Sequence, residues 1–265
     1  MELLTKLLGS INGKSERQEP RTKSKIEWID KATFMVGGHK ITMDYEHGGS
    51  KRKSGQSDFT MMKSRSFLDQ YLAHEGEDFK HILELGVYQG GSFVFLNEVF
   101  QPARIAAIEL SQVPIPALDR YINEQDGRAK LYYGTSQDDE DRLNDIVKHY
   151  FDEELDLVVD DASHFYAQTK ASFRATFPKL RPNGLYIIED WSWSFFDGYQ
   201  EPEHPWAAHA SLANLAIDLM EELALGNGLA EFTVSEHMIK IRRTQQVGQP
   251  VFSKQNRRGR EYNLI

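Results

Sequence analysis

The stretch HILELGVYQGGSF, residues 81–93, places three glycines directly after a short apolar run. Ile82, Leu83 and Leu85 are typical of a buried strand in a parallel sheet, and residues 92–99 are typical of a helix. The glycines therefore predict a turn from strand to helix. In an α/β sheet such turns lie at the carboxyl ends of the strands, where ligands bind.

Strand-like and helix-like runs alternate along the rest of the chain, as far as residue 244. We expect strands over residues 82–86, 104–109, 130–133, 155–160 and 185–189, and helices over residues 62–73, 92–99, 115–124, 138–150, 165–178 and 210–225. The runs 230–238 and 239–244 follow each other without a helix and predict an antiparallel pair at one edge. The predicted fold class is α/β: a Rossmann-like, seven-stranded, mostly parallel sheet with helices on both faces.

The composition limits the classes of function. The 265 residues include 31 Lys and Arg against 40 Asp and Glu, a net charge of −9, which disfavours a nucleic-acid partner. The chain has no cysteine, so disulfides, zinc ribbons and thiol catalysis are excluded. No apolar run approaches the roughly 20 residues that span a bilayer, so we expect no membrane partner and a cytoplasmic location.

The glycine turn and the end of the next strand together indicate a nucleoside site. Gly86, Gly90 and Gly91 do not match the G-x-G-x-x-G spacing that packs a pyrophosphate onto a helix end, so a dinucleotide is disfavoured. Glu109 ends the next strand, 23 residues after Gly86, where an acidic side chain can accept the ribose hydroxyls of an adenosine. The alternative is that the glycines only permit a tight turn and that Glu109 is a solvated strand end.

With these residues the chain resembles the class I S-adenosylmethionine-dependent methyltransferases, whose first motif is an acidic–hydrophobic–glycine loop like ELGVYQG at 84–90. The likeness covers roughly residues 65–242. It implies that Gly86 and its neighbours approach the methionine part of the donor, that Glu109 takes the ribose, and that the GTSQD turn at 134–138 meets the adenine. The predicted cofactor-binding residues are Glu84, Gly86, Tyr88, Gln89, Gly90, Ser92, Glu109, Thr135, Ser136 and Asp160.

Acidic side chains cluster after the fourth and fifth core strands. Asp160 and Asp161 end one run, and Glu189 and Asp190 end the next. In a class I sheet these strands are neighbours about 4.8 Å apart, so the carboxylates can converge, and they would repel one another without a cation. Oxygen ligands suit Mg²⁺, with Ca²⁺ or Mn²⁺ as alternatives. We predict Asp161, Glu189 and Asp190 as metal ligands; otherwise these acids cap helices or face solvent.

A histidine stands beside this cluster. His164 lies three residues after Asp161, where the chain turns into the next predicted helix. An aliphatic hydroxyl is a poor nucleophile until its proton is removed, and histidine is the side chain best matched to neutral pH. We predict His164 as the catalytic base, with His204 and His209 as further candidates. The alternative is an ordinary helix-start or surface histidine.

The sequence DDASH at 160–164 and the sequence EDW, which begins 28 residues after Asp161, form a second motif. Their combination resembles the metal-dependent O-methyltransferases of macrolide sugar tailoring, the mycinamicin and macrocin type, and the related cephalosporin hydroxylase-like group. This resemblance implies O-methylation of a hydroxyl in a natural product, as in antibiotic or polyketide biosynthesis. It matches Asp161, Glu189 and Asp190 to the metal positions and His164 to the base.

Three alternatives stay open: a polyketide-synthase-associated O-methyltransferase, a hydroxylase, and a non-catalytic adenosyl-binding protein. The usual non-haem iron set of two histidines and one carboxylate is not visible, which weighs against a hydroxylase. The expected partner is a small-molecule or carrier-tethered hydroxylated acceptor. Self-association into a homo-oligomer through an aromatic patch is a further expectation.

We divide the chain into three parts. Residues 1–60 are an N-terminal extension with a linker and a β-hairpin at Gly37 and Gly38, residues 61–244 are the methyltransferase domain, and residues 245–265 are a polar tail. Within the domain, the aromatic segment 192–210 is unusually long for a connection and predicts a lid over the acceptor.

Overall fold

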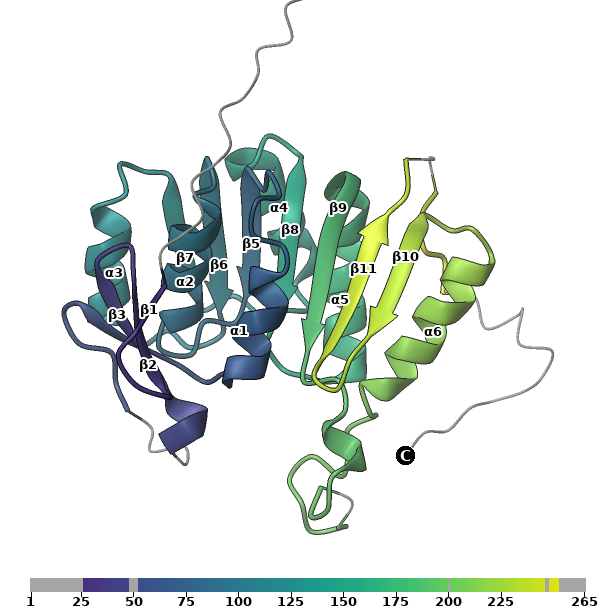
Figure 1. The fold of residues 1–265 in the computed structure, drawn as a ribbon. Coiled ribbons are helices and arrows are strands. Elements are labelled where there is room, and N and C mark those ends of the chain that lie inside the picture. The colour runs from purple at the N-terminus through teal and green to yellow at the C-terminus, as the bar shows by residue number, and fades with distance from the viewer. Residues whose placement is uncertain (1–25, 48–51, 200, 246–247, 253–265) are drawn as a thin grey trace, which may run out of the picture.

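The structure is a computed structural model that describes residues 26–47, 52–199, 201–245 and 248–252. The predicted linker at residues 9–25 and the end of the predicted tail, residues 253–265, lie outside the described residues. The described chain contains one large sheet, the helices that cover it, and a smaller N-terminal sheet (Figure 1).

The large sheet has seven strands in the order β10-β11-β9-β8-β5-β6-β7. The strands are β5 (His81–Leu85), β6 (Arg104–Glu109), β7 (Ala129–Tyr133), β8 (Leu155–Asp160), β9 (Leu180–Glu189), β10 (Leu229–Val234) and β11 (Met238–Arg243). β5 to β9 run parallel, whereas β11 is antiparallel to both β9 and β10. The predicted α/β fold class is confirmed. The chain moves outward on one side from β5 to β7 and on the other from β8 to β9, so the switch point lies between β5 and β8.

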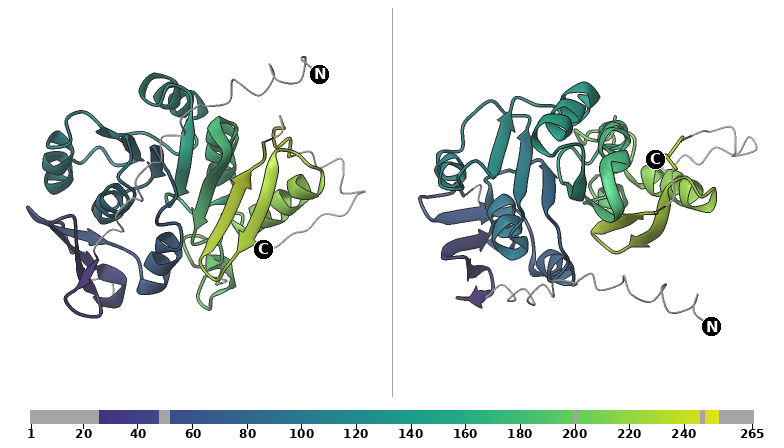
Figure 2. Two further views of the ribbon diagram at one scale, coloured as in Figure 1. Left: turned by 45° about the horizontal axis from the view of Figure 1, so that its top comes forward. Right: turned by 90° about the horizontal axis from the view of Figure 1, so that it is seen from above.

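Helices cover both faces of this sheet (Figure 2). α1 (Arg65–Leu72), α2 (Gly91–Phe100) and α3 (Pro116–Asn123) share one apolar core, and α4 (Glu140–Tyr150), α5 (Tyr166–Thr176) and α6 (Ala213–Ala224) share the other. Successive strand residues point to opposite faces, so Ile82 belongs to the first core and Leu83 to the second. None of the described helices is long and apolar enough to cross a membrane.

The predicted helices are present, and their ends differ from the prediction by up to three residues. The largest differences are at α1 and α6, each of which begins three residues later than predicted. Before α1, residues 58–61 form a strand, and the chain needs residues 62–64 to pass from that strand into the helix.

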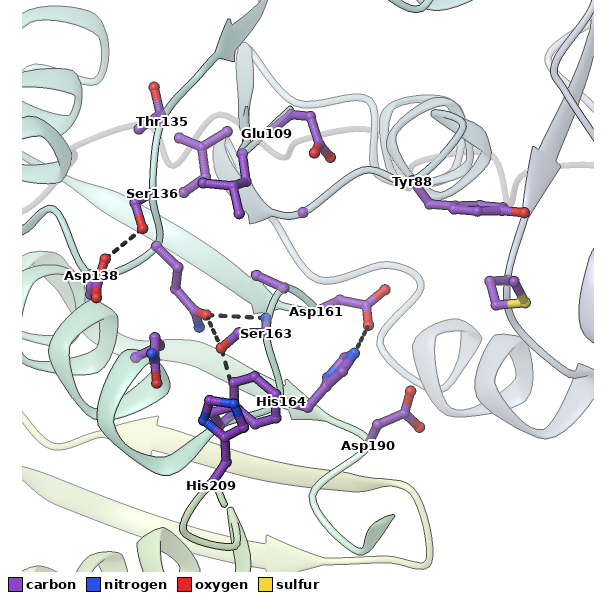
Figure 3. Close-up of a pocket in the computed structure, with 18 residues that line it drawn as sticks. Tyr88, Glu109, Thr135, Ser136, Asp138, Asp161, Ser163, His164, Asp190 and His209 are labelled. Carbon is purple, nitrogen blue, oxygen red and sulfur yellow. Dashed lines mark hydrogen bonds and ion pairs between the residues drawn. The ribbon is translucent and has the colours of Figure 1, made fainter. Parts of the chain in front are cut away.

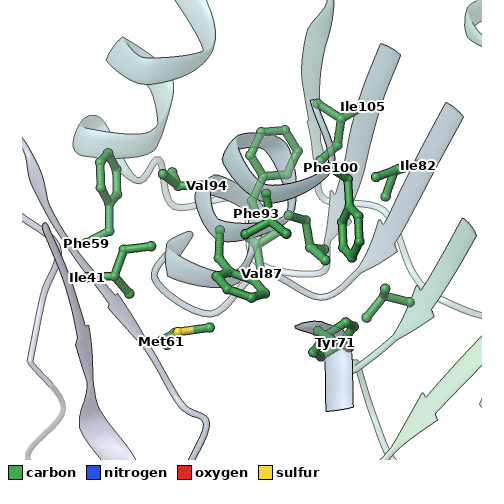
Figure 4. Close-up of a cluster of buried hydrophobic side chains, with 14 of the residues drawn as sticks. Ile41, Phe59, Met61, Tyr71, Ile82, Val87, Phe93, Val94, Phe100 and Ile105 are labelled. Carbon is green, nitrogen blue, oxygen red and sulfur yellow. The ribbon is translucent and has the colours of Figure 1, made fainter. Parts of the chain in front are cut away.

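The N-terminal part of the described chain forms the smaller sheet, in the order β1-β2-β3-β4. Its strands are β1 (Glu27–Trp28), β2 (Thr33–Val36), β3 (His39–Met43) and β4 (Asp58–Met61), with a 3-10 turn, η1 (Asp44–His47), after β3. β2 and β3 form a hairpin, and β4 joins β3 in parallel. Ile41 and Phe59 of this sheet share an apolar core with Phe93 and Val94 of α2 (Figure 4). The small sheet therefore packs against the helix that follows the glycine turn.

Candidate active site

A cavity of about 550 Å³ lies at the carboxyl ends of the parallel strands (Figure 3). Its walls come from the turn after β5, the end of β6, the turn after β7 and the segments that follow β8 and β9. The predicted site residues that line it are Gly86, Tyr88, Glu109, Thr135, Ser136, Asp161, His164 and Asp190. The predicted site residues outside its lining are Glu84, Gln89, Gly90, Ser92, Asp160 and Glu189. Residues predicted to bind the methyl donor and residues predicted to bind the metal thus line the same cavity.

Gly86 brings the glycine turn against the end of β8. Its φ is +85°, a conformation that side chains rarely adopt, and a Cβ added there would lie 2.4 Å from the backbone oxygen of Asp161. The Gly86 N–H donates to the Ile108 oxygen at 3.0 Å, and the Asp161 N–H donates to the Leu85 oxygen at 3.0 Å. A glycine is required here because the predicted donor site and the acidic cluster share this contact.

The N-terminal segment holds the other side of the turn. A Cβ on Gly91 would lie 2.5 Å from the backbone oxygen of Thr60 in β4. Ser54 donates through its hydroxyl to the Gln89 backbone oxygen at 2.6 Å, and through its N–H to the Gln89 side chain at 3.2 Å. Tyr88 donates to the buried Asp44 carboxylate at 3.1 Å. Gln89, predicted to bind the donor, is instead bonded to the N-terminal segment.

Glu109 lies where an adenosine site requires an acid. Its carboxylate accepts the Ser111 N–H at 2.9 Å and the Val87 N–H at 3.4 Å, which links the end of β6 to the glycine turn. Thr135 and Ser136 line the wall beyond it, after β7, and Ser136 donates to Asp138 at 2.5 Å. These residues form one continuous wall of the cavity.

The Glu84 carboxylate is buried directly before the turn. Neither of its oxygens has a hydrogen-bond partner of good geometry among the described residues. Burial raises the pKa of Glu84 to about 8, and the nearby Ser92 hydroxyl offsets this only in part. A buried carboxyl without a partner is costly to ionise, so a bound cationic group near this turn would stabilise it.

Asp160, which is predicted to bind the cofactor, lies beneath the cavity wall. Its carboxylate is buried outside the cavity lining and accepts hydrogen bonds from Gln137 at 2.5 Å, Ser172 at 2.6 Å and Tyr186 at 2.8 Å. Burial raises its pKa to about 6. Gln137 also accepts the Ser163 hydroxyl at 2.7 Å, so Asp160 positions the loop that carries His164 from behind. Gln137 and Ser163 lie within the GTSQD and DDASH motifs, but the sequence analysis assigns neither of them a role.

Asp161, His164 and Asp190 converge on the opposite side of the cavity from Tyr88 and Glu109 (Figure 3). One ligand atom from each lies within 4.8 Å of the others. His164 Nε2 is 3.9 Å from Asp161 Oδ1. His164 and Asp190 have φ angles of 59° and 51°, which are uncommon for residues other than glycine and often occur at functional sites. Burial and the Asp161 carboxylate raise the pKa of Asp190.

Glu189 is separated from this group by a lysine that the sequence analysis did not identify. The Lys63 ammonium, between β4 and α1, donates to Glu189 Oε2 at 2.5 Å and to Asp161 Oδ2 at 2.6 Å. The other Glu189 oxygen accepts the Tyr71 hydroxyl of α1. The predicted set of three carboxylates around one ion is therefore not assembled in this conformation.

The predicted metal ligands fit a divalent ion in part. Asp161 and Asp190 offer carboxylate oxygens on the cavity wall, which are ligands that Mg²⁺ prefers, and His164 lies beside them. Both Glu189 oxygens are engaged by Lys63 and Tyr71. Glu189 could join Asp161 and Asp190 as a ligand only if its carboxylate left these partners.

The aromatic segment after β9 packs beside His164. Trp193 is buried, contacts Trp206 edge to face with ring centroids 5.2 Å apart, and donates from Nε1 to the His164 backbone oxygen at 2.8 Å. His209 lines the cavity, whereas His204 is outside its lining. The segment fixes the His164 backbone, and its predicted role as a lid stays a proposal.

Proteins with similar sequences give evidence on the relatives of this chain that does not depend on the geometry of the cavity. Residues 83–191 match a family described as a methyltransferase domain. The mycinamicin VI 2''-O-methyltransferase of Micromonospora griseorubida is 28% identical over 217 residues, 73% of this chain and 51% of that protein. The demethylmacrocin O-methyltransferase of Streptomyces fradiae is 28% identical over 172 residues, 60% of this chain and 41% of that protein. The chain thus spans about half the length of these curated relatives.

Solved structures agree in fold. The MycE methyltransferase of the mycinamycin pathway, in complex with Mg and SAH, has a TM-score of 0.53 at 20% identity, over 70% of this chain and 50% of that one. The SAH-bound Podospora anserina methyltransferase PaMTH1 has a TM-score of 0.52 at 18% identity, over 69% of this chain and 80% of that one. The protein has the fold of a class I S-adenosylmethionine-dependent methyltransferase. Its resemblance to the O-methyltransferases of the mycinamicin and macrocin type is confirmed.

Proposed function

We propose that this chain is a divalent-metal-dependent O-methyltransferase that moves a methyl group from S-adenosylmethionine to a hydroxyl of a sugar- or polyketide-type natural product. The observation that carries the proposal is the single cavity that joins Glu109 and the glycine turn to His164 and Asp190. Methyl transfer needs donor and acceptor held together in line, and one shared cavity permits that arrangement.

The adenosine part of S-adenosylmethionine would lie along the wall formed by Glu109 and Thr135. Glu109 accepts the ribose hydroxyls, and the Ser111 and Val87 N–H groups keep its carboxylate in place. The methionine part would lie at the glycine turn, where the buried Glu84 carboxyl favours its ammonium group. This arrangement directs the donor methyl toward the wall that carries His164.

In the chemical step the acceptor oxygen attacks the methyl carbon of the sulfonium. The S–CH₃ bond breaks, the O–CH₃ bond forms, and the donor leaves as a neutral thioether. His164 accepts the hydroxyl proton at a ring nitrogen, and the neighbouring Asp161 carboxylate stabilises the imidazolium that results. The His164 ring is partly exposed on the cavity wall, where a hydroxyl can reach it.

A divalent ion would be held by Asp161 and Asp190, with Glu189 as a third ligand once it is released. When bound, such an ion lowers the pKa of a hydroxyl that it contacts. The names of the two curated relatives support a macrolide-type acceptor, because both act on such compounds. We extend that acceptor class to this chain, with a carrier-tethered acceptor as the second possibility.

An acceptor screen tests the proposal. The purified full chain is incubated with Mg²⁺, S-adenosylmethionine carrying a labelled methyl group, and a panel of glycosylated macrolides, free polyketides and hydroxyl-free analogues. The proposal predicts label in an ether linkage on a hydroxylated acceptor and none on the analogues, as read by mass spectrometry. Label transferred to nitrogen or carbon, or donor binding without transfer to any member of the panel, would contradict it.

A further inference from the structure

The Lys63 side chain is an internal cation at the predicted metal site. Its side chain is only 3% exposed, and its ammonium lies 2.6 Å from Asp161 and 2.5 Å from Glu189. It also lies 5.8 Å from the centre of the Phe67 ring, which covers it from α1. Two of the three predicted metal ligands therefore already share one positive charge.

The ammonium is held between two carboxylates in the interior. It forms ion pairs with Asp161 Oδ2 at 2.6 Å and with Glu189 Oε2 at 2.5 Å. A buried pair of carboxylates needs such a cation, because removing it would leave uncompensated negative charge in the interior. Lys63 thus supplies one of the two positive charges that a divalent ion would supply.

The ammonium and an ion compete for the same oxygens. Lys63 and Tyr71 use both oxygens of Glu189, and Lys63 uses one oxygen of Asp161. Asp190 is outside these contacts, and its carboxylate faces the cavity (Figure 3). A metal that recruits all three carboxylates must draw Glu189 away from Lys63, and it would then lie close to a like charge that opposes its binding.

We infer that Lys63 sets the metal affinity of this site: it holds Glu189 and Asp161 while no ion is bound, and it must release Glu189 when a divalent ion enters. The inference rests on the proposed metal-dependent function. It assigns to a residue between β4 and α1 a positioning role toward the ion, separate from the chemistry of methyl transfer.

The first test measures Mg²⁺ and Mn²⁺ affinity by calorimetry and by electron paramagnetic resonance, without donor or acceptor. Lys63→Met should bind both ions about 10-fold or more tightly than the wild type, because the competing charge is gone. Lys170→Met is the matched control, since Lys170 is also a part-buried lysine paired with an acid, Asp218, at 3.1 Å. The control should leave metal affinity unchanged. Unchanged or weaker affinity in folded Lys63→Met would overturn the inference.

A second measurement uses the unsubstituted protein, in case Lys63→Met folds poorly. In ¹⁵N-lysine-labelled protein, the buried and hydrogen-bonded Lys63 ammonium should give a protected NMR signal, assigned by its loss in Lys63→Arg. Saturating Mg²⁺ should shift this signal and speed its exchange with solvent. A Lys63 signal that is unchanged at Mg²⁺ saturation would show that the ammonium keeps its partners, and the inference would fail.

The outcomes separate this inference from the proposed function. If Lys63→Met binds the ion and the wild type does not, the inference holds while metal dependence of the natural protein fails. If both bind with equal affinity, metal binding stands and the inference fails. If neither binds, both fail.

Discussion

The backbone oxygen of Asp161 lies 2.4 Å from the position that a Cβ of Gly86 would take. The glycine turn, which we propose binds the methyl donor, and the strand end that carries the acidic cluster are therefore in direct contact. A side chain at residue 86 would push the two apart, so one shared contact positions the proposed donor site and the acidic cluster.

Gly86→Ala tests this contact. It combines a positive φ with a backbone clash, and it should lower stability by about 2–4 kcal/mol and abolish measurable SAH binding. Gly226→Ala is the matched control, because its φ is +72° and no described atom lies within 4 Å of its Cβ position. It should lose only about 1 kcal/mol and keep SAH affinity. Thermal unfolding and calorimetry measure both quantities, and equal effects of the two variants would refute the role of the contact.

Glu109→Ala should weaken SAH binding by roughly 1–3 kcal/mol, since ribose hydroxyls would lose a charged acceptor. The exposed Glu124, at the end of α3, provides a control for the change in net charge. Glu124→Ala should leave the affinity unchanged. Tighter binding of a nicotinamide dinucleotide than of SAH by the wild type would overturn the assignment of the site.

Glu84 should make stability depend on pH. Burial raises its pKa to about 8 from an ordinary value of 4.5, so the unfolded chain ionises at lower pH than the folded one. The resulting loss of stability is absent below pH 4.5, grows as the pH rises toward 8, and is complete above it. In the donor-free protein, the unfolding free energy of Glu84→Gln minus that of the wild type should therefore be larger at pH 8.5 than at pH 4. Urea unfolding at the two values measures this, and a pH-independent difference would argue against a neutral Glu84.

Much of the fold follows from the sequence because apolar runs and turn residues are local signals. The run LDLVVD predicts β8, which is buried along its length, and the three glycines predict the turn before α2. The acids are harder to place, since consecutive strand residues point to opposite faces. Asp160 therefore turns toward Ser172 of α5, and Glu189 turns toward Tyr71 of α1.

Lys63 could not have been found in this way. It lies at the start of the helix predicted over residues 62–73, where no local pattern points to its partners, which are 98 and 126 residues further along the chain. The same holds for Ser54, whose bonds to Gln89 depend on how the small sheet packs. Contacts between a terminal segment and a distant core leave no local pattern to read.

His164→Ala should lower turnover by about 10²- to 10⁴-fold while SAH affinity stays nearly constant, because the base contacts the acceptor and not the adenosine. His209→Ala is the comparison, since His209 also lines the cavity. Initial rates with a fixed acceptor, together with calorimetry, separate the two effects. If His209→Ala loses turnover and His164→Ala keeps it, the proton acceptor is His209.

The most direct measurement of the central claim is methyl transfer in chelator, followed by the addition of Mg²⁺, for the wild type and for Asp190→Ala. Asp190 is a suitable test residue because it lines the cavity, and the hydrogen bonds that Lys63 donates go to Asp161 and Glu189. We predict that chelation abolishes turnover, that Mg²⁺ restores it in the wild type, and that Asp190→Ala regains little of it while SAH affinity stays unchanged. Full turnover of the wild type in chelator, with no gain on adding Mg²⁺, would contradict the account and leave His164 as the sole activating group.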